Sequence, residues 1–218
     1  MTSEELMNIK CPKCQADIDF TVWNYLNVQL HPDVAKRLRN GSLFTVRCNH
    51  CGFQTNMAYP IIYDDIAHNV ILKFTKAKTQ AELEKEAETT KNEYAAARAD
   101  DPGIVENLRL RLVTDMNDLI EKANIFNEGY DDRYVEIYKH LAKREIQKSK
   151  PELDIRSLRF RTEGGVQHFL LSDVDGKPVG SIKFDQLQYN QLIEECHIEK
   201  DCDPLVDEEW VQEYLGEL

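Results

Sequence analysis

Apolar and polar side chains alternate with a period of two in the first third of the chain. Ile18, Phe20 and Val22 are separated by polar residues, which is typical of a half-buried strand. A short helix over residues 34–39 follows and ends at an Asn-Gly pair. Further strands are predicted in this region at residues 43–46, 53–63 and 70–76, the last two with apolar runs at residues 59–63 and 70–74. The first third is therefore predicted to be a β unit with one short helix.

The middle of the chain has the longer period of amphipathic helices. Thr79 and Glu82 form a capping-box signal at the start of a helix over residues 80–98. A second helix is predicted to start at Asp101-Pro102. Its apolar face is predicted to comprise Leu112, Val113, Met116, Leu119, Ile120 and Ala123. A third helix follows Asp131-Asp132 and ends before Pro151.

The period returns to two after Lys150, where we place a domain boundary. Three short strands are predicted at residues 153–160, 166–171 and 179–184. Gly164-Gly165 lies in the first turn, and residues 173–178 form the second turn. Helices are predicted to start at Asp185 and to include Trp210. These last elements form a small antiparallel meander with two helices.

Two cysteine pairs supply the strongest chemical signal. They are Cys11-Pro12-Lys13-Cys14 and Cys48-Asn49-His50-Cys51, and 33 residues separate them. The predicted metal ligands are Cys11, Cys14, Cys48 and Cys51, which together form the four-thiolate set of a structural Zn²⁺ site. Four sulfurs fill a tetrahedral site and leave no position for substrate. Iron takes the same ligand set and stays an alternative.

The predicted fold class is α+β, with two domains. Residues 8–148 form a zinc-ribbon-like β unit with a helical extension, and residues 151–218 form the small antiparallel β meander with two helices. Between Cys51 and Phe53, Gly52 is expected to have a positive φ.

Charge is distributed unevenly along the chain, whose formal net charge is −12. Residues 1–78 hold nine Lys and Arg against seven Asp and Glu, and residues 194–218 hold ten acidic residues against one lysine. The acidic end predicts a protein partner, and the weak basic excess argues against nucleic acid. A nucleic-acid-binding ribbon stays an alternative through a basic-aromatic patch of Lys36, Arg37, Arg39, Arg47, Phe44 and Tyr59.

The sequence predicts a non-enzymatic, cytoplasmic protein. It shows neither a secretory signal nor an apolar run long enough for a membrane span. Thiols stay reduced in the cytosol, so the cysteine pairs favour metal over disulfides. A thiol redox enzyme, or another enzyme with its site between the domains, is the remaining alternative. A redox motif needs a helix at its first cysteine, and a strand pattern follows Cys14 instead.

Several other residues have side chains that could bind a metal or act in catalysis, but their spacing does not favour a site. Cys196, His197 and Cys202 could hold a second metal, but this spacing is more typical of one buried cysteine and a bystander. Asp173 and Asp175 resemble half of a calcium loop that lacks its closing Glu. The spacing to an acid that is typical of a catalytic set is absent at His31, His50, His68, His140 and His168.

Over roughly residues 8–140 the chain resembles the CpXC domain family of prokaryotes, which is functionally uncharacterised. The matching segments are Cys11-Pro12-Lys13-Cys14, Cys48-Asn49-His50-Cys51-Gly52, residues 59–65, Arg111-Leu112-Val113, Asn117, residues 119–122, Ile125-Phe126, Asp131-Asp132-Arg133 and Ile137-Tyr138-Lys139. The resemblance implies a metal-binding domain and no reaction. Gln15 departs from the Gly of many such knuckles, and a Gln at positive φ costs about 1 kcal/mol.

Overall fold

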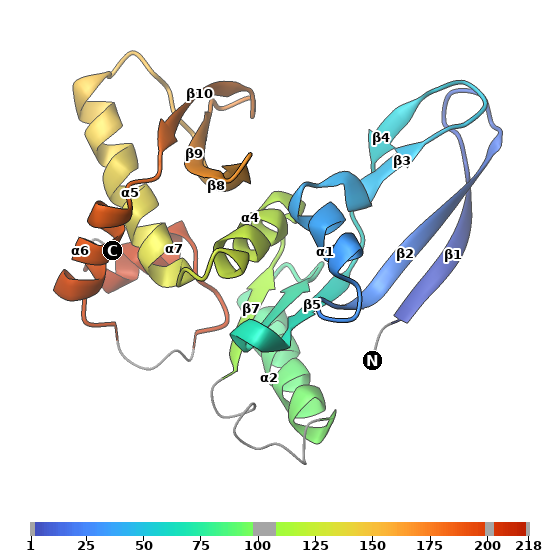
Figure 1. The fold of residues 1–218 in the computed structure, drawn as a ribbon, viewed down its shortest axis with the longest axis horizontal. Helices are drawn as coiled ribbons and strands as arrows, with labels where there is room; N and C mark the ends of the chain where they lie inside the picture. Colours follow the sequence, from blue (N-terminus) through green and yellow to red (C-terminus); the bar gives the residue numbers. More distant parts are fainter. Residues whose placement is uncertain (1–2, 98–107, 199–202, 217–218) are drawn as a thin grey trace. The chain divides into compact units, whose positions relative to one another are not determined.

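The computed structural model describes residues 3–97, 108–198 and 203–216 (Figure 1). Its helices and sheets confirm the predicted α+β class. The chain divides into two compact units, Met1–Ala123 and Asn124–Leu218. No helix in the described part of the chain combines the length and the apolar character that crossing a membrane requires.

The first unit is built on a five-stranded mixed sheet in the order β1-β2-β5-β6-β7. Its strands are β1 (Ser3–Lys10), β2 (Asp17–Asn27), β5 (Ile61–Asp65), β6 (Val70–Phe74) and β7 (Arg109–Val113). The pairs β1–β2 and β5–β6 are antiparallel, whereas β2–β5 and β6–β7 are parallel. Parallel neighbours need long crossover connections. The helices of this unit lie in those crossovers or follow the last strand.

Among the described residues, three helices and a small second sheet complete the first unit. The helices are α1 (Pro32–Arg39), α2 (Gln80–Ala97) and α4 (Met116–Asn127), the last of which continues past the division between the units. Four short elements lie between α1 and α2 in the chain. They are the 3-10 turns η1 (Ser42–Phe44) and η2 (Ile66–His68) and the strands β3 (Thr45–Arg47) and β4 (Gln54–Asn56). Contacts join α1 to β2 and α2 to β7. The predicted end of α1 is confirmed, since Gly41 has a φ of 80°.

The predicted helical face was wrong at its beginning. Leu112 and Val113 belong to β7, and α4 begins only at Met116. Four consecutive residues of β7, from Leu110 to Val113, are buried, so this strand has no alternation of exposed and buried positions. A continuous buried run cannot be separated from a helix by periodicity alone. The helix start predicted at Asp101-Pro102 lies outside the described residues.

The predicted capping box at the start of α2 is confirmed. The Glu82 N–H donates to Thr79 Oγ1 at 3.3 Å, and the Thr79 N–H donates to Glu82 Oε2 at 3.2 Å. The Lys78 N–H also donates to Glu82 Oε2, at 2.7 Å. These backbone donors, that of Lys78 first, lower the pKa of the Glu82 carboxyl.

Replacing Thr79 with alanine should therefore weaken α2. We expect the free energy of unfolding to fall by about 1 kcal/mol, because the side-chain oxygen that caps the helix is lost. Urea titration of the full chain measures the change. Thr89→Ala is the control, since Thr89 is an exposed residue in the middle of the same helix. There alanine should stabilise slightly through its helix propensity, and equal losses in both variants would contradict the cap.

The second unit contains the predicted antiparallel meander with its two helices. A three-stranded sheet in the order β10-β9-β8 is flanked by α5 before it and by α6 and α7 after it. The elements are α5 (Asp132–Ser149), β8 (Ser157–Glu163), β9 (Val166–Ser172), β10 (Pro178–Lys183), α6 (Gln186–Glu195) and α7 (Glu208–Tyr214). The Asp173 carboxylate accepts from the N–H groups of Asp175 and Lys177, which makes this segment a hairpin turn.

An aromatic core joins α5 to this sheet. Phe160 and Phe169 are fully buried, and their ring centroids lie 5.2 and 5.5 Å from that of Phe184. From α5, Val135 and Tyr138 enter the same cluster. The predicted boundary followed the change of period near Lys150. The compact units divide after Ala123, since the apolar face of α5 packs within the second unit.

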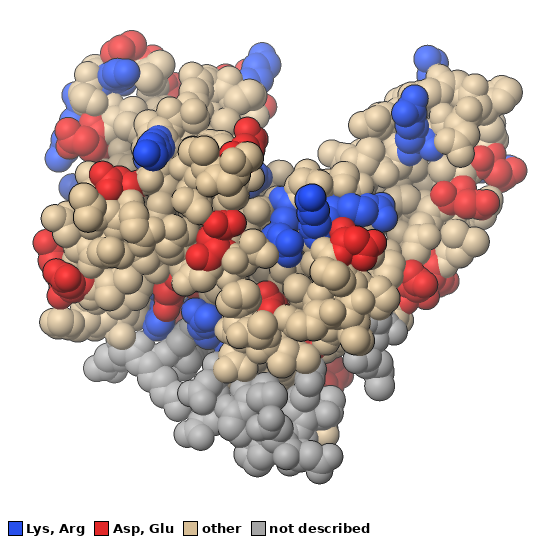
Figure 2. All heavy atoms as spheres, viewed as in Figure 1, with Lys and Arg blue, Asp and Glu red and all other residues tan. Residues whose placement is uncertain are grey.

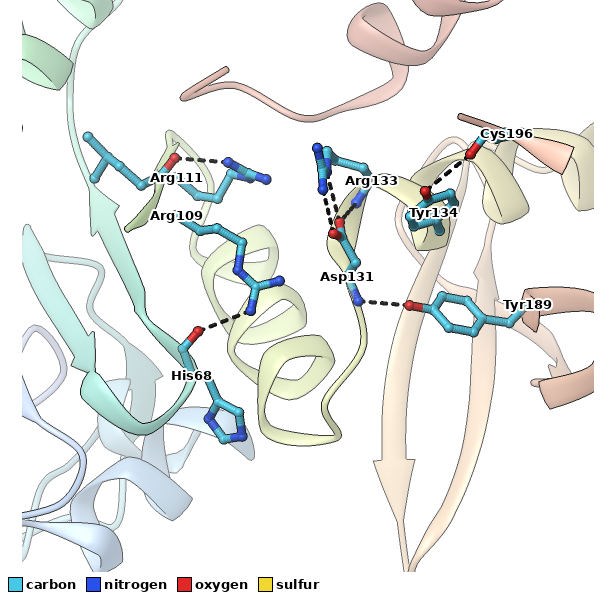
Figure 3. Close-up of polar contacts among 9 residues, drawn as sticks. His68, Arg109, Arg111, Asp131, Arg133, Tyr134, Tyr189 and Cys196 are labelled. Carbon is cyan, nitrogen blue, oxygen red and sulfur yellow. Dashed lines mark hydrogen bonds and ion pairs between the residues drawn. The ribbon is translucent and has the colours of Figure 1, made fainter. Parts of the chain in front are cut away.

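The start of α5 is fixed by polar contacts within the second unit (Figure 3). The Asp131 carboxylate caps the helix by accepting from the Arg133 N–H at 3.0 Å, and it pairs with the Arg133 guanidinium at 2.7 Å. The Asp131 N–H donates to the Tyr189 hydroxyl at 2.9 Å, and the Tyr134 hydroxyl donates to the Cys196 carbonyl at 3.1 Å. These two bonds link the start of α5 to α6 and to the residue that follows it.

Candidate metal centre

Each cysteine pair forms the turn of a β-hairpin. The first pair lies between the end of β1 at Lys10 and the start of β2 at Asp17. The second lies between the end of β3 at Arg47 and the start of β4 at Gln54. Figure 1 shows the ends of the two hairpins side by side. The strands thus carry two short cysteine turns, 33 residues apart in sequence, to one place.

The two turns share one backbone hydrogen-bond pattern. In the first, the Gln15 N–H donates to the Cys11 carbonyl at 2.9 Å, and the Cys11 N–H donates to the Ala16 carbonyl at 2.9 Å. In the second, the Gly52 N–H donates to the Cys48 carbonyl at 2.9 Å, and the Cys48 N–H donates to Phe53 at 2.8 Å. The first and fourth residues of each turn consequently direct their sulfurs to the same side.

All four sulfurs come within 4.8 Å of one another. The Sγ atoms of Cys11 and Cys51 are 3.7 Å apart, as are those of Cys14 and Cys48. Four sulfurs bound tetrahedrally at the Zn–S distance of ~2.3 Å stand about 3.8 Å apart. The cluster therefore has the dimensions of a four-thiolate metal site. Among the residues that the structure describes, it is the one group of His, Cys, Asp and Glu side chains close enough to hold a metal ion.

The environment of the sulfurs differs between positions. Cys11 and Cys48 are buried, whereas Cys14 and Cys51 are half-buried. Burial raises the pKa of Cys11, but the N–H groups of Cys14 and Lys13 and the neighbouring thiols outweigh it and lower the pKa to about 6. The pKa of Cys48 is lowered as well, first by the Cys51 N–H. Backbone donors of this kind stabilise thiolates, which are the form that binds metal.

The fifth residue of each turn has a left-handed backbone, as predicted for Gly52. The φ angle is 72° at Gly52 and 61° at Gln15. A side chain in this region costs about 1–2 kcal/mol, and glycine avoids the cost. The first turn therefore has the same shape as the second but carries strain at Gln15.

We expect Gln15→Gly to stabilise the first unit. The relief of strain, about 1–2 kcal/mol, exceeds the entropy cost of glycine, about 0.5–1 kcal/mol, so the net gain should be about 0.5–1 kcal/mol. Chemical denaturation of the metal-loaded protein measures it. Gly52→Ala is the matched control, since no atom lies within 4 Å of the added Cβ and only backbone strain should act. It should destabilise, and two changes of the same sign would contradict the argument.

The surroundings of the cluster bear on two alternative functions, a thiol redox enzyme and a nucleic-acid-binding ribbon. Cys14 is followed by β2, so the helix that a thioredoxin-type cysteine needs is missing at this position. Figure 2 shows Lys and Arg side chains gathered over α1, where Lys36 and Arg37 are exposed. The two aromatic members of the expected basic-aromatic patch, Phe44 and Tyr59, are buried in the core and cannot stack on bases.

The second cysteine group is not assembled in the described chain. Cys196 is half-buried in the second unit, and burial raises the pKa of its thiol. His197 next to it is exposed, and Cys202 lies outside the described residues. This arrangement gives no support for a second metal.

A histidine–carboxylate pair was missed in the sequence. His68 Nδ1 lies 2.8 Å from the buried carboxylate of Asp65, to which Gln29 Nε2 also donates at 2.9 Å. Arg109 donates to the His68 carbonyl at 3.0 Å (Figure 3). The three-residue spacing from Asp65 to His68, the last residue of η2, was the available signal, but Asp65 was predicted to lie in a turn and not at the end of β5. The pair orients one imidazole and by itself assigns no reaction.

Comparison with known proteins gives one match. A family model described as CpXC protein matches residues 9–139. No curated protein matches the chain, and no solved structure does.

Proposed function

The chain belongs to the CpXC family, and from that premise we propose that its four cysteines hold a structural Zn²⁺ in a non-enzymatic protein-interaction module. The observation that carries the proposal is the cluster of four Sγ atoms within 4.8 Å of one another, on two turns of the same backbone pattern. Cys11, Cys14, Cys48 and Cys51 would be the ligands.

Zinc is favoured by the ligand set and by the geometry. Four thiolates suit Zn²⁺ or an iron centre, and the 3.7 Å separations of the sulfurs agree with tetrahedral coordination. A structural zinc supplies folding free energy and no open coordination position. The strands that end at the two turns would be held together by the metal, so the surface that they form would depend on it.

Metal analysis of the purified protein tests this part of the proposal. Protein produced with zinc and iron both present should contain about one zinc per chain, measured by elemental analysis. Iron in its place would give the colour and absorption of a thiolate–iron centre. Protein that binds neither metal, and whose circular dichroism does not respond to a chelator, would contradict a structural site.

A protein partner is favoured by the charge at the end of the chain. Residues 194–218 hold ten acidic side chains against one lysine, and Glu194, Glu195, Glu209 and Glu213 are exposed. A surface of one sign attracts a partner of the opposite sign and accelerates association. We therefore propose that a basic protein surface binds the acidic segment.

Cross-linking in cell extract tests the acidic segment. The full chain is compared with a variant in which these four glutamates are replaced by glutamine, which keeps size and removes charge. Partners captured by the wild type and lost in the variant, and lost again at high salt, would support the proposal. Identical capture by both proteins would refute it.

A further inference from the structure

β1 is an edge strand whose pairing with β2 is regular over most of its length. It lies at the end of the sheet, with β2 as its one neighbour among the described strands (Figure 1). From Glu4 to Lys10 its pairing with β2 continues without a bulge, and the segment contains neither proline nor glycine. Natural sheets usually block such edges, since the unpaired backbone groups can bind another strand.

The edge strand β10 of the second unit shows the contrast. It begins at Pro178, and its pairing with β9 is interrupted before Gly180. Proline and irregular pairing inside a strand hinder further pairing. The segment of β1 from Glu4 to Lys10 lacks both features, so its charged side chains are what can oppose or select a partner strand there.

The direction of the free backbone groups of β1 follows from its pairing with β2. The Cys11 N–H donates to the Ala16 carbonyl, and the same register continues from Lys10 opposite Asp17 to Glu4 opposite Trp23. In an antiparallel pair, hydrogen-bonded residues alternate with residues whose backbone groups point the other way. Odd-numbered residues therefore bond to β2. The groups that face the open edge belong to Glu4, Leu6, Asn8 and Lys10.

We propose that this edge binds β1 of a second copy of the chain, antiparallel, with Glu4 opposite Lys10 of the partner subunit. In this register Leu6 lies opposite Asn8 of the partner subunit, and all four edge-facing residues have backbone partners. The two-fold axis passes between Met7 and its symmetry mate. Two identical Glu–Lys pairs form, one at each end.

The side chains fit the same register. Leu6 is 69% exposed and Met7 is 40% exposed, although both are apolar. Met7 would face its own copy in a non-hydrogen-bonded pair, where opposite side chains are closest, and Leu6 would be diagonal to its own copy on the other face. The Lys10 Nζ lies 2.6 Å from Asp17 Oδ1 at an exposed site. In the dimer it would lie between this carboxylate and that of Glu4 of the partner subunit.

The neighbouring registers fit less well. If the two β1 strands slide past each other by two residues in one direction, Glu4 lies opposite Asn8 of the partner subunit. Lys10 then extends beyond the end of the partner subunit's strand. The opposite shift places Lys10 opposite Leu6 and leaves Glu4 beyond the strand. Only the proposed register matches both charges. It needs neither the metal nor the acidic segment, so it goes beyond the function proposed above.

Sedimentation velocity over a range of protein concentrations tests the pairing. The full chain should show a reversible monomer–dimer equilibrium. Leu6→Pro removes an N–H that faces the open edge and leaves the ladder with β2 intact, so dimerisation should weaken at least about a hundredfold. Leu6→Thr keeps this N–H, so its dimerisation should weaken much less than that of Leu6→Pro. In a Trp210→Phe background, unchanged emission of the buried Trp23 in both variants verifies the fold.

Charge reversal tests the register separately from the fold. Glu4→Lys and Lys10→Glu each place like charges opposite one another at both ends, so each should weaken self-association about tenfold or more. Mixing the two variants should restore a dimer, since every end then has opposite charges. A wild type that stays monomeric at all concentrations overturns the proposal. The proposal is also overturned if Leu6→Pro leaves the dimerisation affinity unchanged, or if the mixture of Glu4→Lys and Lys10→Glu does not form a dimer.

Discussion

Cys48→Ser is expected to unfold most of the first unit. A structural zinc contributes about 10–16 kcal/mol to the folding of a small domain, which is comparable to the whole stability of about 5–15 kcal/mol. Cys48 is buried at the start of its turn, so its loss removes a ligand and a packed side chain together. Zinc content should fall well below one per chain.

Tryptophan emission locates this loss in the molecule. The chain has two tryptophans, so a Trp210→Phe background leaves Trp23, buried on β2 in the first unit, as the single reporter. Cys48→Ser in this background should shift its emission to that of exposed tryptophan. Cys196→Ser is the matched control, since Cys196 is half-buried in the second unit and should keep both metal and emission. A Cys48→Ser protein with native emission and no metal would argue against a structural site.

Phe160→Ala should lower the free energy of unfolding by about 3–5 kcal/mol. Phe160 is fully buried in the second unit, and its ring packs edge-on against Tyr130 and Phe184, with centroids 5.8 and 5.2 Å away. Its removal leaves a cavity and breaks aromatic contacts of defined geometry. Urea denaturation followed by circular dichroism measures the change.

Val166→Ala provides the comparison within the same sheet. Val166 is 53% exposed at the start of β9, so this change should cost about 0.5 kcal/mol or less. Zinc content should remain at the wild-type level in both variants, because the four cysteines lie in the first unit. A Phe160→Ala protein that loses its metal under native conditions would show that the two units do not hold their structures separately.

Several parts of the fold follow from local sequence. The capping box at Thr79 and the positive φ at Gly52 are set by residues within one turn. The strand predicted over residues 70–76 is present as β6, which covers its apolar run from Val70 to Phe74. The cysteine spacing likewise fixes a tight turn, because two intervening residues bring both sulfurs to one side.

Other parts could not be predicted from local patterns. β1 escaped detection because most of its side chains are exposed, so no alternation marks it. β7 was mistaken for helix because it is buried on both faces. The pairing of His68 with Asp65 depended on where β5 ends, a boundary that sequence patterns place within only a few residues.

The sequence by itself determined that this chain carries two matching cysteine turns in an α+β protein of the CpXC family. Only the tertiary structure decided that the four sulfurs meet within 4.8 Å, and that α5 belongs to the core of the second unit. The physical reason is how far apart along the sequence the interacting residues lie. Turns and caps are fixed by hydrogen bonds between near neighbours in sequence, whereas burial and sheet order depend on contacts between residues far apart along the chain.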